Sequence, residues 1–281
     1  MKLIADGGAT KIQWMVIDEK NTQGPIETAG FNPYIMAPKI LEDIVDKELV
    51  PVIKTEAILE VYYYGAGCST VHKCSIVEDA LKGVFRRADC EIYHDLLGAA
   101  RALLGRESGI ACILGTGSNS CLYDGKDIVE NVTSLGYFLG DEGSGAYLGK
   151  ILLTDYLRKR MPGNIVEAFE KRYRYTVENI LDALYNKSHP NQFLSSFAPF
   201  LSEHQKDDYI RDLVVQNFTA FMDQQVTQYT AYKEQPLGTV GSVGFYFSDI
   251  FASVARQYGL TVNTVIQSPI EGLVKFHQPE K

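Results

Sequence analysis

Two segments of the chain share one pattern of apolar and polar positions: an apolar run, a glycine-rich bend and a second apolar run. The first spans residues 3–17 around Asp-Gly-Gly-Ala-Thr-Lys at 6–11, and the second spans residues 110–123 around Gly-Thr-Gly-Ser-Asn-Ser at 115–120. Short apolar runs bounded by turn-forming residues are typical of strands. The sequence therefore predicts two β-hairpins that are related as an internal repeat.

Strand-like and helix-like periodicity alternate between the two hairpins. Apolar residues recur at near-helical spacing after Pro38, whereas residues 57–64 form the continuous apolar run of a strand covered on both faces. The alternation predicts an α/β fold with crossover connections. The expected elements are a strand at 24–32, a helix at 38–54, a strand at 57–64, a helix at 69–87, a strand at 90–94 and a helix at 95–104.

Helical spacing dominates the region after the second hairpin. A loop at 136–149 leads into a helix that ends near Arg160, and residues 164–232 are mostly helical, with breaks near Pro190 and Pro199. The remaining expected elements are a strand at 236–241, a helix at 245–258, a strand at 261–266 and a closing helix at 269–277.

Both glycine-rich bends present bare backbone N–H groups and hydroxyls at one point, an arrangement that suits an anion such as phosphate. Taken alone, each bend could also be an ordinary polar turn, and Lys11 could be a solvated strand residue. Two copies that face each other across a cleft could hold one polyphosphate. The candidate phosphate-binding residues are Gly7, Gly8, Thr10, Lys11, Gly115, Thr116 and Gly117.

Two acidic residues are candidates for phosphoryl-transfer chemistry. Asp6 would repel a phosphate unless a divalent cation lay between them, so it indicates a Mg²⁺-nucleotide; the alternative is a turn-forming Asp. Asp95 follows a predicted strand and begins a helix, where it could accept a proton from a hydroxyl nucleophile as general base. Its alternative is a helix N-cap, for which Asp is well suited.

A third acid could bind a sugar. Asp141 is flanked by glycines and could accept hydrogen bonds from neighbouring sugar hydroxyls, although acids at a helix start are also favoured by the helix dipole. Asn32 and Asn119 could add amide contacts. The glycine-rich segment 238–244 would let backbone approach a ribose or a flat ring.

Composition narrows the classes of partner. The 281 residues, 46% of them hydrophobic, suffice for one large or two modest domains. With 27 Lys and Arg against 35 Asp and Glu, the formal charge of −8 is unsuited to nucleic acid or an anionic membrane. An acid near the start, and the lack of a long apolar run, lead us to expect neither a signal peptide nor a membrane span, hence a cytoplasmic protein.

The sequence lacks several well-known site patterns. Its five cysteines include no C-x-x-C pair, which favours reduced core thiols over a disulfide framework or a zinc site. It also contains neither H-E-x-x-H nor G-x-x-x-x-G-K-[ST], so zinc-protease and P-loop interpretations are excluded.

In their order along the chain, these motifs resemble the sugar kinase, Hsp70 and actin superfamily. More closely, the chain resembles the BadF/BadG/BcrA/BcrD ATPase family and, within it, the N-acetylglucosamine kinases. It departs from their pattern at Ala9, where a third glycine is usual, and at residues 135–139, where these kinases have a Gly-Trp-Gly form. The motifs that carry the resemblance are Asp-Gly-Gly-Ala-Thr-Lys at 6–11, Gly-Thr-Gly-Ser-Asn at 115–119, Gly-Asp-Glu-Gly-Ser at 140–144 and Val-Gly-Ser-Val at 240–243.

The resemblance implies a fold and a reaction. The fold would be two actin-like (ribonuclease H-like) domains around an ATP cleft, formed by residues 1–96 with 268–281 and by residues 97–267. The reaction would be transfer of the γ-phosphate of MgATP to the 6-hydroxyl of an amino sugar, N-acetylglucosamine first, with Asp95 as the base. By the same resemblance, Asn32, Gly117, Asn119 and Asp141 are sugar-binding positions, and Gly241 and Ser242 lie on the nucleotide side.

Two other functions stay open at this stage. The same family contains ATPases that activate radical acyl-CoA dehydratases through an iron-sulfur cluster, although the scattered cysteines argue against such a cluster here. A non-catalytic sugar-binding regulator is the other alternative, but no helix pair suited to reading DNA is evident. The sequence leaves the oligomeric state undetermined, with a homodimer among the options.

Overall fold

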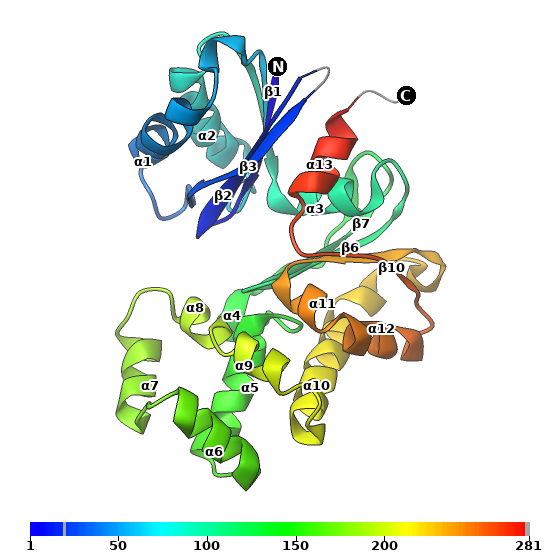
Figure 1. Ribbon diagram of the computed structural model, residues 1–281. Helices are drawn as coiled ribbons and strands as arrows, with labels where there is room; N and C mark the ends of the chain where they lie inside the picture. The colour runs from blue at the N-terminus through cyan, green and yellow to red at the C-terminus, as the bar shows by residue number, and fades with distance from the viewer. Residues whose placement is uncertain (19–20, 279–281) are drawn as a thin grey trace. The chain divides into compact units, whose positions relative to one another are not determined.

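The computed structural model describes residues 1–18 and 21–278, and the chain divides into two compact units (Figure 1). The first unit comprises Met1–Glu107, Gly125–Asp127 and Ser268–Lys281, and the second comprises Ser108–Asp124 and Ile128–Gln267. Each unit contains one five-stranded mixed sheet with helices packed on it. The α/β class predicted from the alternating periodicity is confirmed.

The sheet of the first unit has the strand order β3-β2-β1-β4-β5. Its first three strands form an antiparallel meander, and the last two run parallel to β1. Crossover helices connect the parallel strands, as such connections require. The strands are β1 (Lys2–Gly7), β2 (Lys11–Ile17), β3 (Thr22–Ala29), β4 (Glu60–Gly65) and β5 (Asp89–His94).

The sheet of the second unit repeats this topology. Its order is β10-β9-β6-β7-β8, with β6, β7 and β8 antiparallel and with β9 and β10 parallel to β6. Numbered from the first strand of each unit, both sheets have the order 3-2-1-4-5, which confirms the predicted internal repeat. The strands are β6 (Gly109–Leu114), β7 (Ser118–Tyr123), β8 (Ile128–Glu130), β9 (Leu237–Val240) and β10 (Val262–Ile266).

Helices cover both faces of the first sheet (Figure 1). On one face, α1 (Pro38–Ile44) and α2 (Val71–Val84) bury an apolar core around Trp14. On the other, α13 (Ile270–His277) packs against α3 (Asp95–Leu104) and over Ile4. Residues 97–107, which the sequence-based division assigns to the second domain, cluster with the first unit because α3 packs on α13.

The helix predicted at 38–54 is wrong in its second half. After α1 the chain forms one π-helical turn at Val45–Leu49 and one 3-10 turn at Val50–Val52. Pro51 lies in that last turn and has no N–H to donate to a preceding carbonyl, so a regular α-helix cannot continue through it. The apolar spacing predicts buried positions correctly in this part, because Val45 and Leu49 are buried.

A layer of helices makes up most of the second unit, and its core joins one face of the sheet to these helices. The predicted breaks near residues 190 and 199 are confirmed, because α8 and α9 each begin with a proline in their first turn. The helices are α4 (Gly136–Leu139), α5 (Gly145–Leu157), α6 (Gly163–Arg172), α7 (Val177–Tyr185), α8 (Pro190–Ser195), α9 (Ala198–Glu203), α10 (Asp208–Gln224), α11 (Ser242–Tyr246) and α12 (Ser248–Gln257).

Membrane-crossing helices are not found in the described part of the chain. Within residues 1–18 and 21–278, none of the helices combines the length and apolar character that a bilayer span requires.

The contact between α5 and α8 depends on a glycine. A Cβ atom on Gly149 would lie 1.9 Å from the backbone oxygen of Leu194, so the two helices could not keep their present separation. We expect Gly149→Ala to lower the free energy of unfolding by about 2 kcal/mol, measured by urea denaturation. The control is Gly163→Ala at the start of α6, where a Cβ meets nothing within 4 Å. Equal stability of the two variants would contradict this packing argument.

Candidate active site

Two predicted acids lie at one edge of the first sheet. In the parallel pairs, Gly7 of β1 is opposite Gly65 of β4, and Gly65 is opposite His94 of β5. Asp6 precedes Gly7, and Asp95 follows His94, so both acids lie where the carboxyl ends of the parallel strands meet. This is the edge at which open α/β sheets bind ligands.

The Asp6 carboxyl is in an environment that disfavours its negative charge. Burial raises the pKa of Asp6 to about 7, the charge of Asp95 contributes to the rise, and Lys11 opposes it. A bound divalent cation would relieve this penalty, and carboxylate oxygen is a ligand that Mg²⁺ prefers. Among the described residues there is no cluster of three side chains that could hold a metal ion. As a carboxyl group whose negative charge is disfavoured by burial, Asp6 fits a divalent cation such as Mg²⁺.

The interpretation of Asp95 as an N-cap is wrong. The N-cap of α3 is His94, whose Nδ1 accepts a hydrogen bond from the backbone N–H of Leu96 at 3.0 Å. Asp95 is the first helical residue, and its Oδ1 lies 2.8 Å from His94 Nδ1. About a third of the Asp95 side chain (32%) is exposed, so the carboxylate can be reached by a substrate.

The first glycine-rich bend packs on Tyr63, a buried residue of the tyrosine run at 62–64 that the sequence favours as packing rather than recognition. A Cβ atom on Gly7 would lie 2.3 Å from the hydroxyl of Tyr63, and one on Gly65 would lie 2.3 Å from its ring, so both positions require glycine. The Tyr63 hydroxyl has no hydrogen-bond partner within the described residues. An apolar run such as 57–64 does not reveal which of its side chains extends beneath a neighbouring loop.

The other predicted residues of this bend lie near the surface. Lys11 Nζ is 2.6 Å from Glu27 Oε1, and both side chains are more than half exposed (56% and 52%). Gly8 donates its N–H to the Lys11 carbonyl at 2.9 Å, and Thr10 accepts a hydrogen bond from the Gly30 N–H through its backbone oxygen. These contacts fix the bend against the end of β3.

Asn32 lies against the turn that follows β4. Its Oδ1 accepts a hydrogen bond from the backbone N–H of Tyr34 at 2.9 Å. A Cβ atom on Gly67, where φ is +80°, would lie 2.6 Å from that same oxygen. Of the described residues, none accepts a hydrogen bond from the Asn32 amide nitrogen. Asn32 can therefore still donate to a ligand at the carboxyl edge of the first sheet.

In the second unit, the glycine-rich bend and the start of α5 are joined. The N–H of Gly145 donates to the Gly115 carbonyl at 2.8 Å, and that of Ala146 donates to the Thr116 carbonyl at 3.1 Å. Helix α5 begins at Gly145 after the N-cap Ser144, whose side chain accepts from the Tyr147 N–H. The bend is therefore held by backbone hydrogen bonds from the first turn of a helix.

Asp141 lies directly beside this bend. Its side chain is buried, and a Cβ atom on Gly117 would lie 3.0 Å from its Oδ2. Oδ1 lies 3.5 Å from the Ser118 N–H, its donor. Burial raises the pKa of Asp141, and the Ser118 N–H opposes the rise. Asp141 adopts a left-handed backbone conformation (φ 62°), which few residues other than glycine adopt, although aspartate and asparagine do so more often than most.

Asn119 is the neighbour of Ser118 on β7. Its Oδ1 accepts from the side-chain nitrogen of Asn131 at 3.1 Å and from the Ser120 N–H at 2.9 Å. The carbonyl end of its amide is therefore occupied by protein. Gly117, Asn119 and Asp141, three of the predicted sugar-binding positions, thus lie on one hairpin and the loop before α5.

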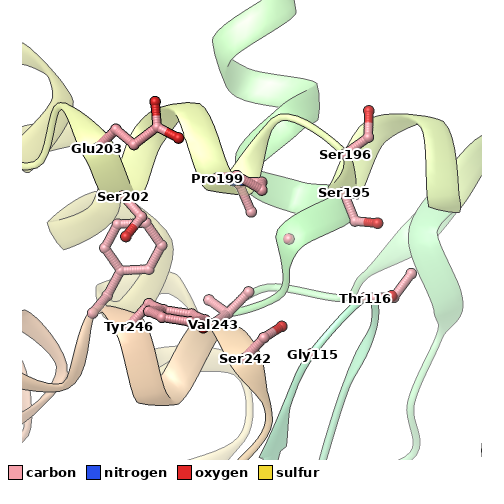
Figure 2. Close-up of a pocket in the computed structure, with 13 residues that line it drawn as sticks. Gly115, Thr116, Ser195, Ser196, Pro199, Ser202, Glu203, Ser242, Val243 and Tyr246 are labelled. Atoms are coloured by element: carbon pink, nitrogen blue, oxygen red, sulfur yellow. The ribbon is translucent and has the colours of Figure 1, made fainter. Parts of the chain in front are cut away.

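A cavity of ≈ 410 Å³ adjoins the second bend (Figure 2). Gly115, Thr116 and Ser242 line it, so three predicted nucleotide residues share one cavity. Gly241 precedes Ser242 and lies against the end of β6: its φ is +118°, and a Cβ there would lie 2.5 Å from the Leu114 carbonyl oxygen. The other lining residues are Gly145, Ser195, Ser196, Ala198, Pro199, Ser202, Glu203, Val243, Tyr246 and Phe247.

The cavity has polar side chains at two opposite ends and apolar side chains between them. Figure 2 shows Thr116 and Ser242 beside Gly115, with Ser202 and Glu203 on the far side of Pro199 and Val243. Apolar walls with a few placed polar groups, at this volume, suit a small-molecule ligand. Sequence reasoning missed Ser195, Ser196, Ser202, Glu203 and Tyr246, because only tertiary packing brings these helix residues to the bend.

Comparison with solved structures identifies the class of protein. The structure of a candidate N-acetylglucosamine kinase from Porphyromonas gingivalis is similar over 99% of this chain and 98% of that one, with 41% identity and a TM-score of 0.94. A candidate N-acetylglucosamine kinase from Chromobacterium violaceum aligns over 99% and 98% of the two chains, with 18% identity and a TM-score of 0.72. A ROK family glucokinase from Streptomyces griseus aligns over 98% and 97%, with 13% identity and a TM-score of 0.54.

The similarity to the Chromobacterium violaceum and Streptomyces griseus structures shows a shared fold. The similarity to the Porphyromonas gingivalis structure, at 41% identity, shows membership of the same family. No protein-family model and no curated protein matches the chain. The two repeated sheets define a two-domain actin-like protein. The chain belongs to the sugar kinases of the actin-like ATPase superfamily. At that level, the resemblance inferred from the motifs is confirmed.

Proposed function

We propose that this protein transfers the γ-phosphate of ATP to the 6-hydroxyl of an amino sugar, with N-acetylglucosamine as the first candidate. The observation that carries the proposal is the pair Asp6 and Asp95 at the carboxyl edge of the first sheet, directly beside a glycine-rich bend. Similarity over nearly the whole length to the Porphyromonas gingivalis protein supports the choice of sugar.

The nucleoside of ATP would occupy the cavity beside Gly115, Thr116 and Ser242. Its size and apolar walls at Pro199 and Val243 suit a purine nucleoside. The two glycine-rich bends would bind the phosphates through polar groups that gather at one point, other than the N–H groups of Gly8 and Gly115, which donate to the carbonyls of Lys11 and Gly117. Gly7, Gly8, Thr10 and Lys11 would contribute from the first bend, and Gly115, Thr116 and Gly117 from the second, with Gly241 backing the nucleoside.

Asp95 would act on the sugar as general base, because its partly exposed carboxylate can accept the proton of the attacking hydroxyl. Asp6 would hold Mg²⁺, which when bound neutralises phosphate charge. Asp141 would accept hydrogen bonds from sugar hydroxyls. Asn32 and Asn119 would donate from their amide nitrogens, and Gly117 leaves room for the sugar beside Asp141.

A panel of sugars tests this function. Each sugar is incubated with MgATP, and both ADP release and phosphosugar formation are measured. We expect N-acetylglucosamine to give the highest kcat/KM, with one ADP released for each phosphosugar formed. Tight sugar binding without ADP release would favour the non-catalytic regulator, and a brown, iron-containing protein after anaerobic purification would favour the dehydratase activator.

The role of Asp141 makes a separate prediction. Asp141→Asn keeps the size of the side chain but removes the charge that strengthens hydrogen bonds from hydroxyl donors. We expect KM for the sugar to rise about tenfold while KM for ATP stays within about twofold. Asp182→Asn, at an exposed carboxylate on α7, is the matched control and should leave both values unchanged. An unchanged KM for the sugar in Asp141→Asn would remove this residue from the sugar site.

A further inference from the structure

The His94 side chain has two partners that compete for one atom. Its Nδ1 lies 3.0 Å from the backbone nitrogen of Leu96, which donates to it, and 2.8 Å from Oδ1 of Asp95. Both partners belong to the first turn of α3, so the imidazole joins the end of β5 to the start of that helix.

These two contacts require opposite states of the same nitrogen. An imidazole nitrogen either carries a lone pair, with which it accepts a hydrogen bond, or a proton, which it donates. With a lone pair, Nδ1 caps the Leu96 N–H but repels a carboxylate oxygen. With a proton, it donates to Asp95 Oδ1 and the Leu96 N–H loses its acceptor. The contact at 2.8 Å therefore needs a proton between His94 and Asp95.

We propose that His94 is the positioning residue of Asp95: with a proton on Nδ1 it holds Oδ1 of the carboxylate, so that Oδ2 is left to accept the proton of the sugar hydroxyl. This inference depends on the proposed role of Asp95 as base. An asparagine at position 94 could serve both partners at once, because its amide nitrogen can donate to Asp95 while its oxygen accepts from Leu96. Alanine could serve neither.

The surrounding charges make this contact sensitive to pH. Asp95 on α3 is the ionisable group that acts on His94, and Asp95 in turn interacts electrostatically with Asp6 on β1, Tyr63 on β4 and Cys68 in the turn after β4. Burial lowers the pKa of His94, but the hydrogen bond and the charge of Asp95 outweigh burial, and the net direction is upward. A positively charged imidazolium would make Asp95 a weaker base, so turnover should fall as His94 takes up its second proton.

The kinetic test compares three variants at saturating MgATP and sugar from about pH 5 to about pH 9. In His94→Asn, we expect a kcat within about threefold of wild type at alkaline pH, without the decline that wild type shows at acid pH. In His94→Ala, we expect kcat to fall about tenfold at every pH, with both KM values nearly unchanged, because orientation is lost but binding is not. His72→Asn, at an exposed histidine of α2, is the control and should behave as wild type.

Two kinetic results would overturn the proposal: an acid decline of kcat in His94→Asn equal to that of wild type, or wild-type kcat in His94→Ala.

A second measurement does not depend on kinase activity. The imidazole nitrogens of His94 are titrated by NMR in wild type and in Asp95→Asn, with His72 as internal reference. We expect a lower midpoint for His94 in Asp95→Asn, and an unchanged midpoint would contradict the contact. If wild type phosphorylates no sugar, the proposed function fails, whereas this titration still decides whether His94 and Asp95 are coupled.

Discussion

Replacing Asp95 with asparagine is expected to lower kcat for sugar phosphorylation by at least about 10²-fold, while both KM values change little. Asparagine has nearly the same shape but cannot accept the hydroxyl proton. The side chain is partly exposed at the first turn of α3, so the substitution leaves no buried charge unpaired. Initial rates of ADP release at saturating MgATP and sugar measure the effect.

The control for this variant is Asp249→Asn, because Asp249 also lies in the first turn of a helix, α12, and is not among the residues assigned to catalysis or binding. It should retain wild-type turnover and show that asparagine at a helix start is harmless. Turnover of Asp95→Asn within about threefold of wild type would exclude Asp95 as the base.

Replacing Asp6 with asparagine is expected to have opposite effects on activity and on the stability of the protein without ligands. Activity should fall about 10²-fold, because the carboxylate that fits Mg²⁺ is lost. Stability should rise at neutral pH, because the ionised carboxyl is disfavoured in the folded chain: burial, with a contribution from Asp95, raises the pKa of Asp6 to about 7.

The sign of this pH dependence follows from proton binding. Between the ordinary pKa of 3.8 and about 7, folded Asp6 retains a proton that the unfolded chain has lost, so the free energy of unfolding falls as pH rises through this range. Asparagine does not titrate. The gain in stability from Asp6→Asn should therefore grow from about pH 4 to about pH 7 and then level off at a value on the order of 4 kcal/mol, at about 1.4 kcal/mol for each pKa unit.

Urea denaturation at several pH values measures this gain, and adding MgCl₂ with ATP should stabilise wild type more than Asp6→Asn. The exposed acid Asp182, changed to asparagine, serves as control and should show no gain that grows with pH. A gain independent of pH, or equal stabilisation of both proteins by MgATP, would contradict the account of Asp6.

The sequence predicts those parts of the fold that depend on interactions between residues close together in the chain. Both hairpins and the alternation of strands and helices follow from apolar periodicity and turn residues, and the structure shows them in two sheets of one topology. The convergence of Asp6 and Asp95 was predictable as well, because each acid lies at the end of a parallel strand, and such ends share an edge. The helix at 38–54 was overextended because apolar spacing outweighed Pro51 in the prediction.

Long-range packing decided what the sequence could not predict. The cavity receives Ser202 and Glu203 from α9 and Tyr246 from α11, and no spacing along the chain connects those residues with Gly115. The alternative of Asp95 as an N-cap rested on aspartate being a common N-cap, but Asp95 is the first helical residue of α3, at the predicted start, and His94 before it is the cap. The tyrosines at 62–64 are predicted to be packing residues, but nothing in that apolar run indicates that Tyr63 lies against Gly7.

Identifying the product of the reaction tests the central claim most directly. Wild-type protein is incubated with MgATP and N-acetylglucosamine, and the phosphorylated sugar is analysed by ³¹P and ¹³C NMR. We expect N-acetylglucosamine 6-phosphate in amounts equal to the ADP released, and no such product from Asp95→Asn. Phosphate on another hydroxyl, or ADP accompanied by free phosphate and unmodified sugar, would contradict the account.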